Sequence, residues 1–126
     1  MTRLPGCVLL GALLFASIAD AATAKPNLLP KEMLGLWSLD PADCAKDASE
    51  AHMAVEPKSV LFYETAHSIK RVATLPDGFL RASGYSVSDG DDRAPASLML
   101  KLIAADKLQV GKTDGQIYHR CPAKRR

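Results

Sequence analysis

Apolar and polar side chains alternate along much of this chain, in short runs separated by clusters of Gly, Pro and Asp. In the run 97–104, Leu98, Leu100 and Leu102 occupy every second position, which places them on one face of an extended strand. This face should point into the core, because a period of two is typical of a strand buried on one side. The pattern predicts antiparallel strands at residues 35–39, 52–56, 59–63, 68–75, 79–88, 97–104, 107–113 and 116–121.

The connections between these runs carry turn-forming residues. Asp-Pro at 40–41 and Pro-Asp-Gly at 76–78 each predict a turn, and residues 89–95 predict an acidic loop. Residues 42–51 predict a loop or a short helix. Asp114-Gly115 predicts a two-residue type I′ hairpin turn, in which both central residues have positive φ.

Seven or eight short strands without a long helix predict an all-β fold, a small antiparallel barrel that is closed or half-open. A β-sandwich is the alternative. Residues 25–121 form the single predicted domain. We expect Phe62 and Tyr85 to line a mouth if the barrel holds a cavity, and the interior otherwise to be filled by Trp37, Leu61, Tyr63, Leu98, Leu100 and Leu102.

Residues 1–24 predict a secretory signal peptide. Arg3 supplies the positive start, residues 7–19 are apolar or small, and Ala22-Thr23-Ala24 provides the small residues that signal peptidase requires. Ala19-Asp20-Ala21 is a second candidate cleavage point. The apolar stretch is shorter than the roughly 20 residues that span a bilayer. We therefore expect a periplasmic or secreted protein with no transmembrane segment after cleavage.

The charge balance narrows the class of partner. There are 16 Lys and Arg against 14 Asp and Glu, a formal net charge of +2. A general basic field is therefore absent, and nucleic acid is not an expected partner. Residues 122–126 include three of the basic side chains and predict a flexible basic tail.

Removal of residues 1–24 leaves two cysteines, Cys44 and Cys121. An even pair in an exported chain predicts a disulfide, although two free thiols or a bridge to another protein are the alternatives. Closing a loop of this length would stabilise the fold by about 4 to 5 kcal/mol in the chain-entropy treatment.

The two ends of the predicted domain resemble those of calycin-type barrels, the lipocalins and their smaller relatives. The residues concerned are Gly35-Leu36-Trp37 and Tyr118-His119-Arg120-Cys121. In calycins a Trp near the start of the first strand packs against an Arg on the last. The resemblance implies that the Arg120 guanidinium lies over the Trp37 indole and closes the barrel. Lipocalins are longer and have a C-terminal helix, which this sequence does not predict.

The chain is more similar to small exported bacterial proteins of unassigned function. Their motifs are G-x-W, D-P-x-x-C, F-Y-E and a terminal Y-x-R-C, which stand here at residues 35–37, 40–44, 62–64 and 118–121. Such proteins often have a second cysteine pair, with one member shortly after F-Y-E. His67 stands in that neighbourhood, so a second bridge is not expected. The resemblance implies the fold and one disulfide, but no activity.

No pattern in the chain predicts catalysis, a metal or a cofactor. His52, His67 and His119 have separations that match no ligand motif. Three aspartates surround Gly90 as in a calcium loop, but Leu100 stands where that loop needs a bidentate Glu. The motifs of serine hydrolases, zinc proteases and phosphate-binding loops are missing from the sequence. We expect a protein that acts by binding rather than as an enzyme.

Two binding functions are the main alternatives. A third is a structural role in a larger envelope assembly, for which Met99 and Ile103 would form an exposed apolar stripe. In the first, the chain inhibits or otherwise engages another envelope or extracellular protein, such as a lysozyme or a protease. The candidate surfaces are the 75–79 turn and the charged loop of Asp89, Asp91, Asp92 and Arg93. In the alternative, the barrel carries a small apolar ligand, as calycins often do.

Overall fold

The structure is a computed structural model that describes residues 27–123. The predicted signal peptide and the last three residues of the predicted basic tail lie outside the described residues. Within these described residues, two short 3₁₀ helices and eight strands follow one another: η2 (Lys31–Met33), β1 (Gly35–Ser38), η3 (Pro41–Ala45), β2 (His52–Glu56), β3 (Ser59–Phe62), β4 (Thr65–Thr74), β5 (Leu80–Ser88), β6 (Ala94–Ala104), β7 (Lys107–Val110) and β8 (Gln116–Arg120).

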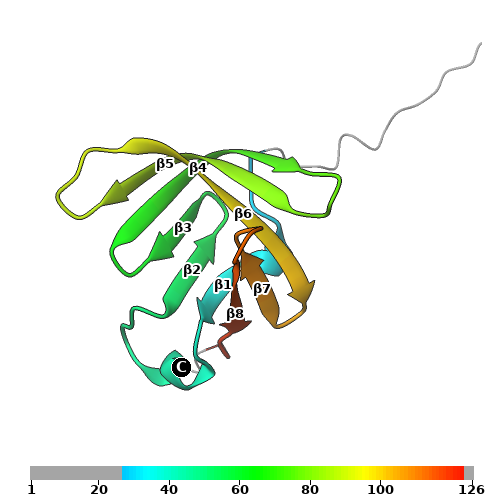
Figure 1. Cartoon of the computed structure of the whole chain (residues 1–126). Helices are drawn as coiled ribbons and strands as arrows, with labels where there is room; N and C mark the ends of the chain where they lie inside the picture. The colour runs from blue at the N-terminus through cyan, green and yellow to red at the C-terminus, as the bar shows by residue number, and fades with distance from the viewer. Residues whose placement is uncertain (1–26, 124–126) are drawn as a thin grey trace, which may run out of the picture.

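Every strand pairs antiparallel with the next, and β8 pairs with β1 to close the sheet into a barrel. In the closing ladder Trp37 lies opposite Arg120, and Ser38 lies opposite His119. The predicted all-β barrel is confirmed in its closed form, and the sandwich alternative is wrong. Figure 1 shows that β4, β5 and β6 are longer than the other strands and form two hairpins that extend beyond them.

Two predicted boundaries on the long strands are wrong. β4 begins at Thr65 and β6 at Ala94, three residues earlier than predicted in each case. Pro95 suggested a loop because proline has no backbone N–H to donate to a ladder. It is accommodated in β6 because β7 pairs only with the part of β6 from Leu100 onward, which leaves Pro95 on a free edge.

The predicted type I′ turn at Asp114-Gly115 is also wrong. Val110 and Gln116 end the paired strands, so five residues connect β7 to β8. Positive φ occurs at Asp114 (56°) and Gly111 (98°), not at Gly115. Gly115 is required for another reason, since a Cβ there would lie 2.0 Å from the carbonyl oxygen of Gly111.

The core fills the interior of the barrel. Trp37, Met53, Leu100 and Leu108 are fully buried and belong to one apolar cluster. The predicted inward stripe on β6 is confirmed, because Leu98 and Leu102 pack against the same cluster.

Leu61 and Tyr63, predicted to be interior, are instead 36% and 55% exposed. Side chains alternate between the two faces of a strand, and in β3 the inward positions go to Val60, which is fully buried, and to Phe62, which packs against the core.

A β-bulge interrupts the ladder between β4 and β5. Ile69 lies opposite Gly84 and Arg71 lies opposite Ser83, so Lys70 is the extra residue. Gly84 is closely approached at this point, because a Cβ there would lie 1.8 Å from the carbonyl oxygen of Ser68. The bulge therefore requires a residue without a side chain on β5.

Candidate functional site

Arg120 closes the barrel through several contacts. Its guanidinium carbon lies 4.3 Å from the centre of the Trp37 ring. Nη1 donates to the carbonyl oxygen of Leu34 (2.9 Å), Nη2 to that of Glu32, and Nε to that of Ala105 (3.1 Å). Arg120 thus joins the last strand to η2 and to the β6–β7 turn, which is the position that the calycin resemblance implies.

Trp37 completes this closure, because its Nε1 donates to the carbonyl oxygen of Met33 (2.9 Å). The indole and the guanidinium are both satisfied by backbone groups of the same barrel end. Each of these four side-chain nitrogens donates to a backbone carbonyl oxygen, so the two side chains hold the barrel closed.

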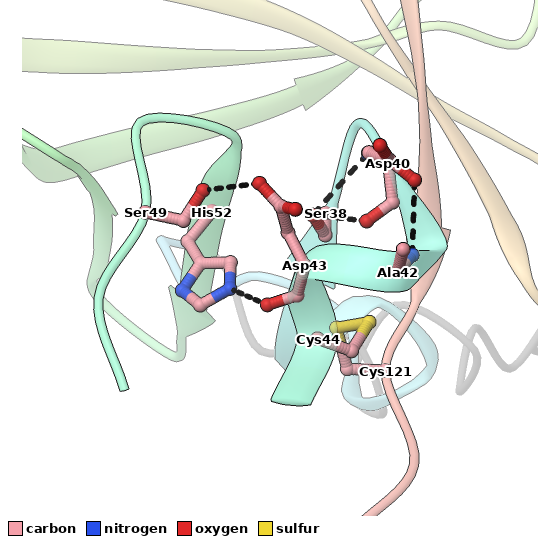
Figure 2. Close-up of a disulfide and its surroundings, with 8 residues drawn as sticks. All are labelled: Ser38, Asp40, Ala42, Asp43, Cys44, Ser49, His52 and Cys121. Carbon is pink, nitrogen blue, oxygen red and sulfur yellow. Dashed lines mark hydrogen bonds between the residues drawn. A yellow bond between two sulfur atoms is a disulfide. The ribbon is translucent and has the colours of Figure 1, made fainter. Parts of the chain in front are cut away.

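Cys44 in η3 and Cys121 after β8 form the predicted disulfide, with Cα atoms 5.4 Å apart. Asp40 caps η3 by accepting a hydrogen bond from the backbone N–H of Ala42 (2.9 Å). A second network holds the segment that follows η3 (Figure 2): Asp43 accepts from Ser49 Oγ (2.7 Å), and its carbonyl oxygen contacts His52 Nε2 (2.7 Å).

The Ser49 hydrogen bond, followed by the one from Lys46, lowers the pKa of the Asp43 carboxyl below its ordinary value. The motif D-P-x-x-C therefore builds a covalent and hydrogen-bonded clamp beside the last strand.

The three histidines lie in separate surroundings. His52 belongs to the clamp, His119 pairs with Ser38 and Lys107 in the ladders, and His67 meets the Phe62 ring edge-on at 5.5 Å. Burial lowers the pKa of His67. Among residues 27–123, no group of three or more His, Cys, Asp or Glu side chains is placed to hold a metal ion.

Phe62 and Tyr85, expected at a common mouth, do not share one. Phe62 points inward toward His67 and Tyr118. Tyr85 lies between Ser68 and Pro95 in the ladders, on the outer face, with the guanidinium of Arg93 4.4 Å from its ring centre. Tyr85 faces outward because its neighbour Gly84 lies opposite Ile69, whose side chain faces the core, and successive residues of a strand alternate between the two faces.

The predicted 75–79 turn is tied to the barrel. Asp77 pairs with Lys112 (2.6 Å), whose hydrogen bond is the main cause of the lowered pKa of Asp77. Phe79 is only 8% exposed, and the ammonium groups of Lys101 and Lys112 lie 5.4 and 5.7 Å from its ring centre. Because its aromatic side chain is already covered, this turn offers little apolar surface to a partner.

An apolar row crosses five neighbouring strands on the outer face of the barrel. In the ladders Leu36 lies opposite Ala54, Ala54 opposite Leu61, Leu61 opposite Ala66, and Ala66 opposite Val87. Leu36 and Ala54 are half-buried, whereas Leu61, Ala66 and Val87 are exposed, Val87 by 44%. Soluble surfaces tolerate scattered apolar residues, but a contiguous row of this kind is typical of a binding surface.

The exposed end of this row lies in an open hollow of about 470 Å³ between the β3–β4 turn and the β5–β6 connection. Tyr63 and the carboxylates of Glu64, Asp89 and Asp91 line the same hollow. Two further open hollows share Tyr63 and extend the surface toward β1 and the segment after η3. The name acidic groove is used below for one surface, which is formed by Leu61, Tyr63, Glu64, Ala66, Val87, Asp89 and Asp91.

The residues of the predicted binding loop do not all belong to one surface. Asp89 and Asp91 line the acidic groove, whereas Arg93 turns toward Tyr85. Asp92 is exposed in the same connection. Sequence reasoning missed the apolar part of the groove. Alternation in 60–63 requires Leu61 and Tyr63 to face outward if Val60 and Phe62 face inward, but the sequence of this strand does not say which pair is inward.

Within the described part of the chain, no helix is both long and apolar enough to cross a bilayer. Comparison of the chain with protein-family models, with curated proteins and with solved structures gives no match.

Proposed function

We propose that this protein is a non-catalytic binding protein of the periplasm or the extracellular medium, which engages another protein through the acidic groove. The observation that carries the proposal is the continuous apolar row from Leu36 to Val87, because it lies on the outside of a barrel that already has a filled core. The row adds nothing to the interior packing of the barrel, and an exposed apolar surface of this extent has a cost in solubility.

The side chains of the groove indicate what kind of partner surface would fit it. Leu61, Tyr63 and Val87 offer an apolar floor, and an aromatic ring is a common anchor in protein interfaces. Glu64, Asp89 and Asp91 surround this floor with negative charge. We infer a partner that inserts an apolar side chain flanked by Lys or Arg, as the rim of a basic enzyme cleft would do. Inhibition of a basic exported hydrolase is the form of this function that we favour.

The alternative, carriage of a small apolar ligand, has weaker support. A carrier barrel needs interior volume, and the side chains of Trp37, Met53, Leu100 and Leu108 occupy the interior here.

The test compares variants within and outside the groove. The mature chain is assayed for binding to a panel of lysozymes and exported proteases, and each hydrolase rate is measured with and without it. The groove variant combines Leu61→Asp with Val87→Asp. The matched control is Ile103→Asp on β6, because Ile103 is 45% exposed and lines none of the hollows of the groove.

For any hydrolase that binds, we expect the groove variant to lose at least about tenfold in affinity, the control to keep it, and added salt to weaken binding. An equal loss in Ile103→Asp contradicts the proposal. So does a panel in which no hydrolase binds and no rate changes.

A further inference from the structure

A second surface, of opposite charge, lies farther along the outer face of β4 and β5. The bulge at Lys70 creates it. Ile69 and Val72 both pack into the core although they are three residues apart, so the two residues between them face outward together. In a regular strand, alternation would put Lys70 and Arg71 on opposite faces. The bulge therefore pairs two cations on one face.

A third cation reaches the same region from the hairpin connection. Arg93 stacks over Tyr85, which stands on β5 next to Gly84. Among residues 27–123, none of these three cations forms an ion pair with a carboxylate. Lys70 and Arg71 repel one another on this face, and an anion placed between them would relieve that repulsion.

Lys70 and Arg71 line an open hollow of about 340 Å³. Its lining consists of Lys70, Arg71, Ser83, Gly84, Tyr85 and Pro95 and contains no carboxylate. Pro95 contributes a compact ring to the hollow, and the backbone of Gly84 lies beside it. Tyr85 adds an aromatic edge and a hydroxyl, and Ser83 adds a second hydroxyl. The volume is in the range of small-molecule sites.

We propose that this hollow, the bulge site, binds an anionic saccharide, a sugar that carries carboxylate or phosphate groups. The CH groups of a pyranose ring pack on Gly84 and Pro95, while its anionic groups accept hydrogen bonds from Lys70 and Arg71. The planar guanidinium of Arg71 matches a carboxylate or phosphate with two parallel hydrogen bonds. Arg93 contributes charge from the side of Tyr85.

The bulge site is independent of the acidic groove. Tyr85 and Val87 are successive outward positions on β5, roughly 7 Å apart, and they belong to different hollows. A protein partner in the groove and a saccharide in the bulge site would therefore bind on adjacent surfaces. Substitutions can be confined to one surface, so the two proposals can fail separately.

The experiment titrates the mature protein with a tetramer of galacturonic acid and follows the backbone amide NMR signals of Gly84 and Tyr85. A neutral tetramer of glucose, inorganic phosphate and vesicles of anionic phospholipid serve as competing probes. The site variant combines Lys70→Gln with Arg71→Gln. The matched control combines Lys58→Gln with Lys107→Gln, which removes the same charge from exposed positions outside the hollow.

We expect saturable binding of the acidic tetramer, shifts centred on Gly84 and Tyr85, and a loss of at least about tenfold in affinity in the site variant alone. The groove variant Leu61→Asp with Val87→Asp should bind the tetramer normally. The proposal is overturned if the neutral tetramer binds equally well, or if phosphate alone binds as tightly as the acidic tetramer. It is also overturned if only vesicles bind, or if the control variant loses as much affinity as the site variant.

Discussion

Replacement of Arg120 by Met tests how the barrel is closed. Met keeps an unbranched side chain against the Trp37 ring but removes the charge and all the donors. Two of the lost hydrogen bonds, to Ala105 and Glu32, are exposed, so water replaces them at little cost. The bond to Leu34 is partly buried and should contribute about 1.5 kcal/mol because its donor is charged. The cation–π contact should add about 1 kcal/mol.

With a few tenths of a kcal/mol from the exposed bonds, the expected loss is about 3 kcal/mol in the free energy of unfolding. For a domain of about 100 residues this lowers Tm by about 15 °C. Arg120→Lys keeps a charge near the ring and should lose about 2 kcal/mol, because an ammonium cannot reach three carbonyls that diverge.

The assay is urea unfolding, followed by the fluorescence of Trp37, which is the only tryptophan in the chain, and by circular dichroism. Arg81→Met is the control, since Arg81 is exposed on the outer face. A change below about 0.5 kcal/mol for Arg120→Met, equal to that of the control, would refute this account of closure.

Three further predictions concern the clamp, the bulge and the interior. Replacing Cys44 and Cys121 by Ser should lower the free energy of unfolding by about 4.5 kcal/mol, because the bridge spans 77 positions. The reduced wild-type protein should unfold at the same urea concentration as the variant. A variant with the same urea midpoint as the oxidised wild type would contradict the estimate. Gly84→Ala should cost about 3 kcal/mol, since its Cβ would overlap the carbonyl oxygen of Ser68; a neutral effect in thermal unfolding would show that the bulge relaxes freely. The lowered pKa of His67 means that the folded state disfavours the imidazolium, so stability should decline as the pH falls below 6.5 and level off below the folded-state pKa. His67→Gln should flatten this part of the curve of Tm against pH. An identical slope in both proteins would exclude His67 as its origin.

The sequence alone determined the class of fold and the covalent link. Alternation of apolar and polar residues is a local property, so it located the eight strands found within residues 27–123. The two cysteines left after the predicted signal peptide predicted one bridge, with free thiols or a bridge to another protein as alternatives, and the structure confirms the internal bridge. The resemblance to calycins placed Trp37 and Arg120 together, because both belong to short motifs at the ends of the domain.

Only the tertiary structure decided which side of each strand became the surface. Residues 60–63 are all apolar or aromatic, so their own sequence does not determine which two side chains face inward. The pairing register of β3 with β2 and β4 determines that Val60 and Phe62 do. The same holds for the acidic groove, whose floor and rim come from residues 61–66 and 87–91, brought together by the pairing of β4 with β5. At the bulge, the extra residue in the β4–β5 ladder places the side chains of Lys70 and Arg71 on the same face. The direction of a side chain there is set by the pairing between strands and not by the sequence of the strand itself.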